Sequence, residues 1–211
     1  MKIILKTFLI LIFVVSASLA QGFKVKASGE QTFNFEDKYK RNQATFFSTT
    51  PLEDITGVSN DVKGKVTFNV SDIKTLKGSI SIPTASIKTG IDLRDEHLRS
   101  ENWLDAANFP DITFFIKKVG DVKVSGDNKL EAKVTGDFSV HGVTKEVVAD
   151  VTMTYLDANE QTQKKAPGDL LGVQAKFKIV LSDYDIDNMI VGQKVADDIE
   201  INANIFGSNA L

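Results

Sequence analysis

The chain has 211 residues, a net charge of −3 and no cysteine. Because acidic and basic side chains are interspersed, the charge gives no electrostatic basis for binding nucleic acid or an anionic membrane surface. The missing cysteine excludes disulfides and a lipid-modified N-terminal cysteine. The chain has only 2 histidines, His97 and His141, so a metal centre is poorly supplied with ligands. We therefore expect no nucleic-acid partner, no metal and no other resident cofactor.

The N-terminal segment has the features of a secretory signal peptide. Lys2 and Lys6 precede an apolar run from Phe8 to Val15, and small residues follow as far as Ala20. The run is short for a bilayer span, which argues against an uncleaved membrane anchor. The sequence thus predicts a signal peptide over residues 1–20 and a single domain over residues 21–211. It also predicts export to the periplasm, with no transmembrane segment in the mature chain.

From Val25 onward, apolar and polar residues alternate with the period of two that is typical of β-strands with one buried face. The alternation is clearest over residues 62–70, 130–140, 147–155, 173–181 and 199–205. It is weaker over residues 25–35, 44–50, 78–82 and 112–119. Turn signals between these segments are Gly120-Asp121, Gly126-Asp127-Asn128, Gly142 and Pro167-Gly168-Asp169. The polar stretch 157–167 is typical of an exposed loop.

Many short amphipathic strands predict an all-β domain whose antiparallel sheet closes into a barrel or folds into a sandwich. A barrel of about eight strands has an interior that just holds one small or slender ligand. The alternation would also suit an outer-membrane barrel, but that class needs aromatic girdles, and the chain has 1 Trp and 3 Tyr. We therefore expect the apolar faces to line the interior.

The charged stretch over residues 89–110 is the one segment that resembles a helix. Asp92 is a plausible N-cap, and Asp95 follows it at the spacing of a capping box. Asp95 and Arg99 stand at i, i+4 in the favourable order. One semi-apolar face is formed by Leu93, His97, Ser100 and Leu104. The pattern predicts a short surface helix over about 92–104 that covers one end of the barrel.

Two groups of ionisable residues allow an alternative interpretation, one as a catalytic pair and one as a calcium site. Asp95 and His97 are side chains of the kind used in acid–base catalysis, but residues two apart on a helix do not face each other and no nucleophile motif accompanies them. Asp183, Asp185 and Asp187 imitate the start of a calcium-binding loop, yet Lys194 stands where that loop needs a glutamate. We therefore expect a loop at the second site and no enzymatic activity.

Several segments, in order along the chain, resemble the YceI-like family. They are TGIDLRDEHLRSENWLDAANFPDITF (89–114), GDFSVHGVTKEV (136–147), FKIVLSDYDI (177–186) and KVADDIEI (194–201). The resemblance implies an eight-stranded, antiparallel, lipocalin-like barrel that binds a long polyisoprenoid or another amphiphilic chain in an apolar tunnel. The segment 41–57 lacks the early histidine of many members, so the chain is similar to a divergent branch.

The expected function is that of an exported carrier or scavenger, a monomer or homodimer, with a long apolar or amphiphilic ligand as its partner. A polyisoprenoid, an isoprenoid quinone or a fatty-acid-like molecule would suit. The alternative is an envelope structural or interaction protein whose barrel core is filled. The expected ligand-binding residues, on the apolar faces and at the mouth, are Phe46, Phe68, Ile80, Ile82, Leu93, His97, Trp103, Phe109, Phe114, Val134, Phe138, Val151, Met153, Phe177, Ile179 and Ile201.

Overall fold

The computed structural model describes residues 21–211, so the predicted signal peptide lies outside the described residues. The strands are β1 (Glu30–Asn34), β2 (Gln43–Thr49), β3 (Asp54–Ser59), β4 (Lys63–Asn69), β5 (Asp72–Pro83), β6 (Asp111–Gly126), β7 (Lys129–Val140), β8 (Val143–Leu156), β9 (Leu170–Val180) and β10 (Asp198–Ser208). The helices are α1 (Asp92–Arg99) and α2 (Glu160–Gln163), and short 3-10 turns are η1 (Thr84–Ser86) and η2 (Leu181–Tyr184).

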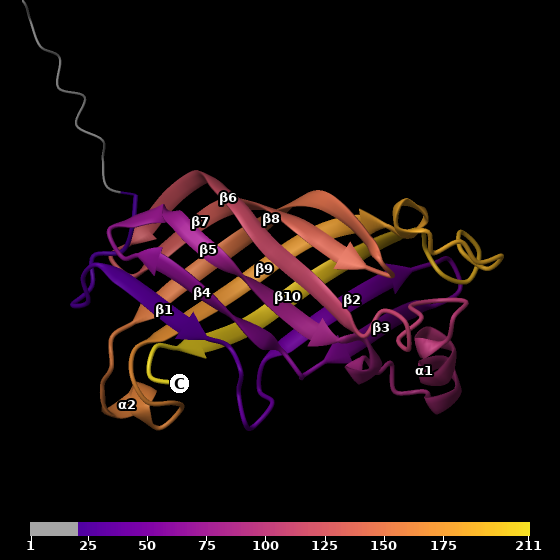
Figure 1. Cartoon of the computed structure of the whole chain (residues 1–211), viewed down its shortest axis with the longest axis horizontal. Coiled ribbons are helices and arrows are strands. Elements are labelled where there is room, and N and C mark those ends of the chain that lie inside the picture. The colour runs from indigo at the N-terminus through magenta and orange to yellow at the C-terminus, as the bar shows by residue number, and fades with distance from the viewer. Residues whose placement is uncertain (1–20) are drawn as a thin grey trace, which may run out of the picture.

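All strands belong to one antiparallel sheet of 10 strands in the order β1-β4-β5-β6-β7-β8-β9-β10-β2-β3. β1 also pairs with β10, and this contact closes a barrel of 8 strands (Figure 1). β2 pairs with β10 farther along the same edge, and β3 pairs with β2. The predicted eight-stranded antiparallel barrel with a short helix is therefore confirmed, and the β2–β3 hairpin extends the barrel wall at one end.

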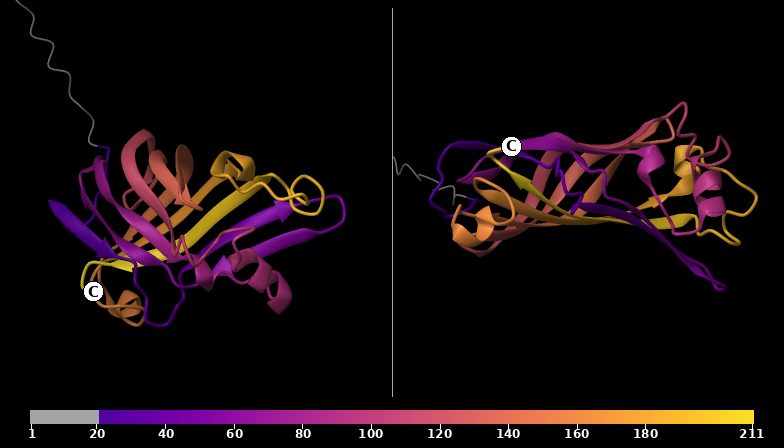
Figure 2. Two further views of the ribbon diagram at one scale, coloured as in Figure 1. Left: turned by 45° about the vertical axis from the view of Figure 1, so that its right-hand side comes forward. Right: turned by 90° about the horizontal axis from the view of Figure 1, so that it is seen from below.

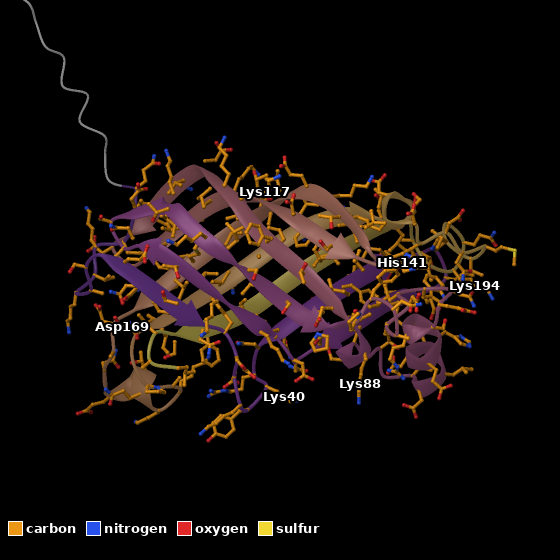
Figure 3. The ribbon with its side chains drawn as sticks, viewed as in Figure 1. Lys40, Lys88, Lys117, His141, Asp169 and Lys194 are labelled. Carbon is orange, nitrogen blue, oxygen red and sulfur yellow. The ribbon has the colours of Figure 1, made fainter. Side chains whose placement is uncertain are left out.

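The apolar faces of the strands point into the barrel. Along β7, for example, the buried residues Leu130, Ala132, Val134 and Phe138 alternate with more exposed polar residues. On the outer surface, the Lys117 amine reaches Asp137 and Glu146 on neighbouring strands at 3.2 and 2.9 Å (Figure 3). Such exposed ion pairs add little stability, so burial of the inner faces is the main stabilising contribution.

The end of the barrel near α2 and the C-terminus is called the closed end here (Figure 1). Buried aromatic side chains fill it. Segment 21–28 crosses this end, where the Phe23 backbone N–H donates to the Val70 carbonyl at 2.7 Å. The predicted strand from Val25 therefore starts later, at Glu30 in β1. The Tyr155 hydroxyl donates to Asp169 at 2.7 Å (Figure 3). The aromatic cluster consists of Phe23, Phe33, Phe68 and Tyr155, with ring centroids 5.5–5.9 Å apart.

The Asn42 side chain fills a gap in the sheet where β10 changes partner from β1 to β2. Asn42 is 1% exposed, and its amide nitrogen donates to the carbonyls of Phe35 and Phe206 at 2.7 and 3.0 Å. Its amide oxygen accepts from the Phe206 backbone N–H at 2.8 Å. The side chain thus replaces the backbone partners that neither strand supplies at this point.

We expect Asn42→Ala to lower the free energy of unfolding by about 2–3 kcal/mol, because it leaves buried backbone groups without partners. Urea unfolding at neutral pH measures this change. Asn204→Ala, at an exposed position of β10, the strand to which Asn42 hydrogen-bonds, is the matched control and should change stability by about 0.5 kcal/mol or less. Equal effects of the two substitutions would contradict the role assigned to Asn42.

Hairpin and bulge geometry decide two of the sequence predictions. The predicted turn at Gly142 is present: His141 and Gly142 join β7 to β8 with φ of 52° and 76°, as a tight two-residue hairpin requires. The predicted turn at Gly120-Asp121 is wrong, because β6 continues to Gly126. Its register against β7 shifts between Gly120 and Lys123, so the turn residues form a bulge that bends one long strand.

The remaining differences concern short elements. β3 was not predicted, and four residues of the predicted loop 157–167 form α2, whose N-terminus is capped by Asn159. The helix α1 ends at Arg99 rather than Leu104, and its N-cap is Ile91, so Asp92 lies in its first turn. After Arg99 the chain continues in tight turns, with the Trp103 N–H donating to the Ser100 carbonyl at 3.1 Å.

Candidate functional site

An apolar cavity of about 480 Å³ lies inside the barrel. Its inner part is lined by residues such as Met153 and Leu171, beside the core that fills the closed end. It extends to the opposite end, called the mouth here, which is formed by α1, the tip of the β2–β3 hairpin and segment 181–197 (Figures 1 and 2). There it reaches the surface at Ile91 and Leu93, which are 52% and 61% exposed.

All of the predicted binding residues except Phe68 and Phe109 line this cavity. Phe68 does face the interior, but it stacks on Phe33 at 5.7 Å between ring centroids in the filled closed end. Phe109 packs edge-on against His141 at 5.2 Å, beside Gly142 of the β7–β8 hairpin. Both residues therefore pack against structural neighbours and, unlike the other predicted binding residues, do not line the cavity.

Aromatic rings from several strands meet along the cavity wall. Phe177 of β9 lies 5.7 Å from Phe114 of β6 and 5.1 Å from Phe138 of β7, measured between ring centroids. Gly136 faces the Phe114 ring, and a β-carbon at this glycine would clash with it. The absence of a side chain at this position thus lets a large ring lie flat on the sheet. The cavity wall offers contact surface to an apolar guest, with few polar groups.

Asp95 of α1 is a structural residue. It is 5% exposed, and one carboxylate oxygen accepts hydrogen bonds from the Thr89 N–H and the Thr89 hydroxyl, both at 2.6 Å. Burial raises the pKa of the Asp95 carboxyl, but the hydrogen bonds from Thr89 and the charges of Arg99 and Lys88 lower it below its ordinary value. The exposed Asp95–Arg99 pair expected from the sequence is therefore replaced by a buried carboxylate that ties α1 to the preceding loop.

We expect Asp95→Asn to lower the free energy of unfolding by about 1–2 kcal/mol at pH 7, because a neutral amide is a weaker acceptor. Since the folded-state pKa of Asp95 lies below the ordinary value of an aspartate, the carboxylate contributes its full stability above that ordinary pKa and loses the contribution as the pH falls through the folded-state pKa. Urea unfolding at pH 7 and at pH 3 should show a smaller difference at pH 3.

The control for this measurement is Asp92→Asn, which changes an exposed carboxylate in the first turn of the same helix. It should cost at most about 0.5 kcal/mol at either pH. If Asp95→Asn were as mild as Asp92→Asn at pH 7, the buried hydrogen bonds would have no energetic role.

Ionisable residues of the cavity lining lie at the mouth. Arg94 of α1 pairs with Glu53 of the β2–β3 turn at 3.6 Å, and its Nε donates to the Thr89 hydroxyl at 2.9 Å. His97 and Lys194 complete the ionisable lining residues, and Lys194 is seen at the same end in Figure 3. These groups could orient the polar end of a guest whose chain lies in the apolar interior.

Sequence reasoning missed Glu53, Arg94 and Lys194 as lining residues. The only feature of the sequence that could have indicated them is their position beside apolar segments or segments typical of the family.

Among residues 21–211, no group of three or more His, Asp or Glu side chains is placed to hold a metal ion. Within the same range, no helix has both the length and the apolar character needed to cross a membrane.

Solved structures of known proteins have a similar fold. The crystal structure of BcnA from Burkholderia cenocepacia superposes with a TM-score of 0.62 at 18% identity, covering 79% of this chain and 96% of that protein. A structure from Saccharophagus degradans, described as a polyisoprenoid binding domain implicated in plant cell wall breakdown, has a TM-score of 0.62 at 15% identity and covers 87% and 99%. At these identities the similarity establishes the fold.

Sequence relatives are closer. A UPF0312 protein from Pseudomonas fluorescens is 35% identical over 140 residues, which cover 64% of this chain and 71% of the relative. Protein YceI from Escherichia coli O6:H1 is 31% identical over 181 residues, or 85% of this chain and 84% of the relative. A family model described as the YceI-like domain matches residues 26–206. The chain therefore belongs to the YceI-like family.

Proposed function

We propose that this protein is an exported, non-catalytic carrier or scavenger of a long apolar or amphiphilic molecule. The observation that carries the proposal is the apolar cavity of about 480 Å³ inside the barrel. Its size is within the range of small-molecule sites, which is about 300–1,000 Å³. A polyisoprenoid, an isoprenoid quinone or a fatty-acid-like chain has the slender apolar shape that such an interior accepts. The predicted signal peptide supports export to the periplasm.

The lining suggests how affinity and selectivity arise. Burial contributes roughly 25 cal/mol per Å² of apolar area, before the costs of association are subtracted. The inner lining is dominated by aliphatic and aromatic residues, among them Val134, Val151 and Met153, so it discriminates by length and shape. Charged groups lie at the mouth, where the Glu53–Arg94 pair is found. A guest would therefore enter with its apolar chain first and leave its polar end at the mouth.

Two further observations support the ligand class. The similar structure from Saccharophagus degradans is described as a polyisoprenoid binding domain. In this chain, the aromatic rings of Phe114, Phe138 and Phe177 provide a wall against which an unsaturated chain can pack. The core that fills the closed end is what the alternative, an envelope protein with a filled barrel, would require. The rest of the interior does not meet that requirement, because it contains the cavity.

Native mass spectrometry of the purified mature protein, followed by solvent extraction, tests the proposal. We expect an adduct with the mass of a long-chain lipid, and we expect the extracted protein to take up an apolar fluorescent probe with one-to-one stoichiometry. A protein that carries no lipid and takes up no probe would favour the alternative of an envelope structural or interaction protein.

A further inference from the structure

The most exposed large apolar side chains of residues 21–211 lie at the mouth. Met189 and Leu52 head the order at 91% and 85% exposed, and two further exposed apolar side chains, Leu93 at 61% and Ile91 at 52%, lie at the same end. We call these residues the mouth tips. The other exposed large apolar side chains of the described residues lie on separate elements: Tyr39 in the loop between β1 and β2, Phe115 and Val124 on β6, Val148 and Leu156 on β8, and Leu211 at the end of the chain. A concentration of aliphatic groups in water is unfavourable, so the mouth tips require an explanation.

The mouth tips project from separate segments that surround the opening of the cavity. Leu52 lies in the β2–β3 turn, Ile91 and Leu93 lie at the start of α1, and Met189 lies in segment 181–197. These segments lie at the same end of the barrel, and the β2–β3 hairpin projects beyond it in Figure 2. Ile91 and Leu93 also line the cavity, so at these two residues the exposed apolar surface is continuous with the interior.

We propose that the mouth tips insert into the surface of a lipid bilayer, so that the cavity opens directly to the apolar phase of the membrane. This inference rests on the proposed carrier function, because a long apolar guest is stored in membranes and crosses water at a high cost. With the mouth against the bilayer, the guest passes from lipid to the barrel interior without exposing its chain to water.

The shape and chemistry of the mouth favour a lipid surface over a protein partner. The mouth tips are non-aromatic apolar side chains that lie on three separate segments, whereas protein interfaces concentrate their binding energy in packed Trp, Tyr and Arg residues. A fluid bilayer surface adapts to separate projecting side chains, and a protein surface would need a matching pocket for each. Insertion of a few aliphatic side chains gives weak, reversible binding, comparable in kind to a single acyl anchor.

The charges at the mouth determine which lipids suit this docking. In the segment around α1, the acidic residues are Asp92, Asp95, Glu96, Glu101 and Asp105, against Lys88, Arg94 and Arg99. In segment 181–197, the acidic residues are Asp183, Asp185, Asp187 and Asp197, against Lys194. Because acidic residues outnumber basic ones, anionic lipids should not strengthen binding. Docking should depend on apolar insertion and should change little with salt.

The test is flotation of the full mature protein with vesicles of pure phosphatidylcholine. We expect wild-type protein to float with the vesicles, and Leu52→Ser and Met189→Ser each to lower the partition coefficient about tenfold, since each loses an inserted aliphatic group. Neither residue lines the cavity, so probe uptake in vesicle-free solution should be unchanged. Phe115→Ser, which changes a 57% exposed apolar side chain of β6 on the barrel wall, is the matched control and should float like wild type.

Other outcomes separate docking from the carrier function. Wild-type protein that takes up the probe but does not float would overturn docking and leave the carrier proposal in place. Protein that floats but takes up no probe would contradict the carrier proposal alone. Equal losses for Phe115→Ser and Leu52→Ser, or flotation only with vesicles that contain phosphatidylglycerol, would overturn insertion through the mouth tips.

Discussion

Val134→Asp is expected to abolish the folded barrel. Val134 is 3% exposed on β7, and its side chain faces the interior beside Ala149 of β8. An aspartate there must either bury its charge or be neutralised, and it also loses the apolar contacts of valine. We expect the free energy of unfolding to fall by at least about 4 kcal/mol, which is comparable with the total stability of about 5–15 kcal/mol of a typical domain.

Circular dichroism and urea unfolding of the variant measure this effect. Thr135→Asp is the matched control, because it introduces the same carboxylate at the neighbouring residue, which faces outward from the barrel. The control should change stability by about 1 kcal/mol or less. If Val134→Asp stayed folded with an unchanged midpoint while Thr135→Asp unfolded the protein, the inner and outer faces of β7 would be assigned the wrong way round.

Alternation identified the barrel wall because the two faces of its strands differ strongly in polarity. β7 is the clearest case, since its inner positions are apolar or glycine and its outer positions are polar. β3 was not predicted because only one of its inward-facing residues, Ile55, Gly57 and Ser59, has a large apolar side chain. The sequence therefore shows no alternation of apolar and polar residues there. Gly57 is required by packing, because a side chain at this position would clash with the Phe46 ring on β2. This contact between neighbouring strands leaves no local pattern.

The sequence could predict which residues of the candidate site face the interior of the barrel, but not which part of that interior is empty. A strand period tells which side chains point inward, and for most of the predicted residues the inward face is the cavity wall. It does not tell where the interior is filled. Phe68 lies in a filled region because Phe23, from a segment far away in sequence, packs against it at 5.9 Å between ring centroids. Similarly, the burial of Asp95 depends on Thr89 folding back over the helix, which helix periodicity does not describe.

Ala175→Phe is expected to abolish probe uptake while leaving the barrel folded. Ala175 of β9 is a half-buried residue of the cavity lining, between Val151 on β8 and Ala203 on β10. A phenylalanine ring at this position would project into the cavity and occupy space that the guest needs. Because the ring fills empty apolar space and displaces few packed atoms, the stability cost should be at most about 1–3 kcal/mol.

Fluorescence titration with the apolar probe measures the loss, and we expect the affinity to fall at least about a hundredfold, or ~2.7 kcal/mol. Gln174→Phe is the control, since it places the same ring on the exposed outer face one residue away and should leave uptake unchanged. Both variants need unfolding curves, so that loss of uptake is not confused with loss of fold. Unchanged uptake by a folded Ala175→Phe protein would mean that the guest does not occupy the middle of the barrel, because a ring at that position and an extended chain cannot share the same space.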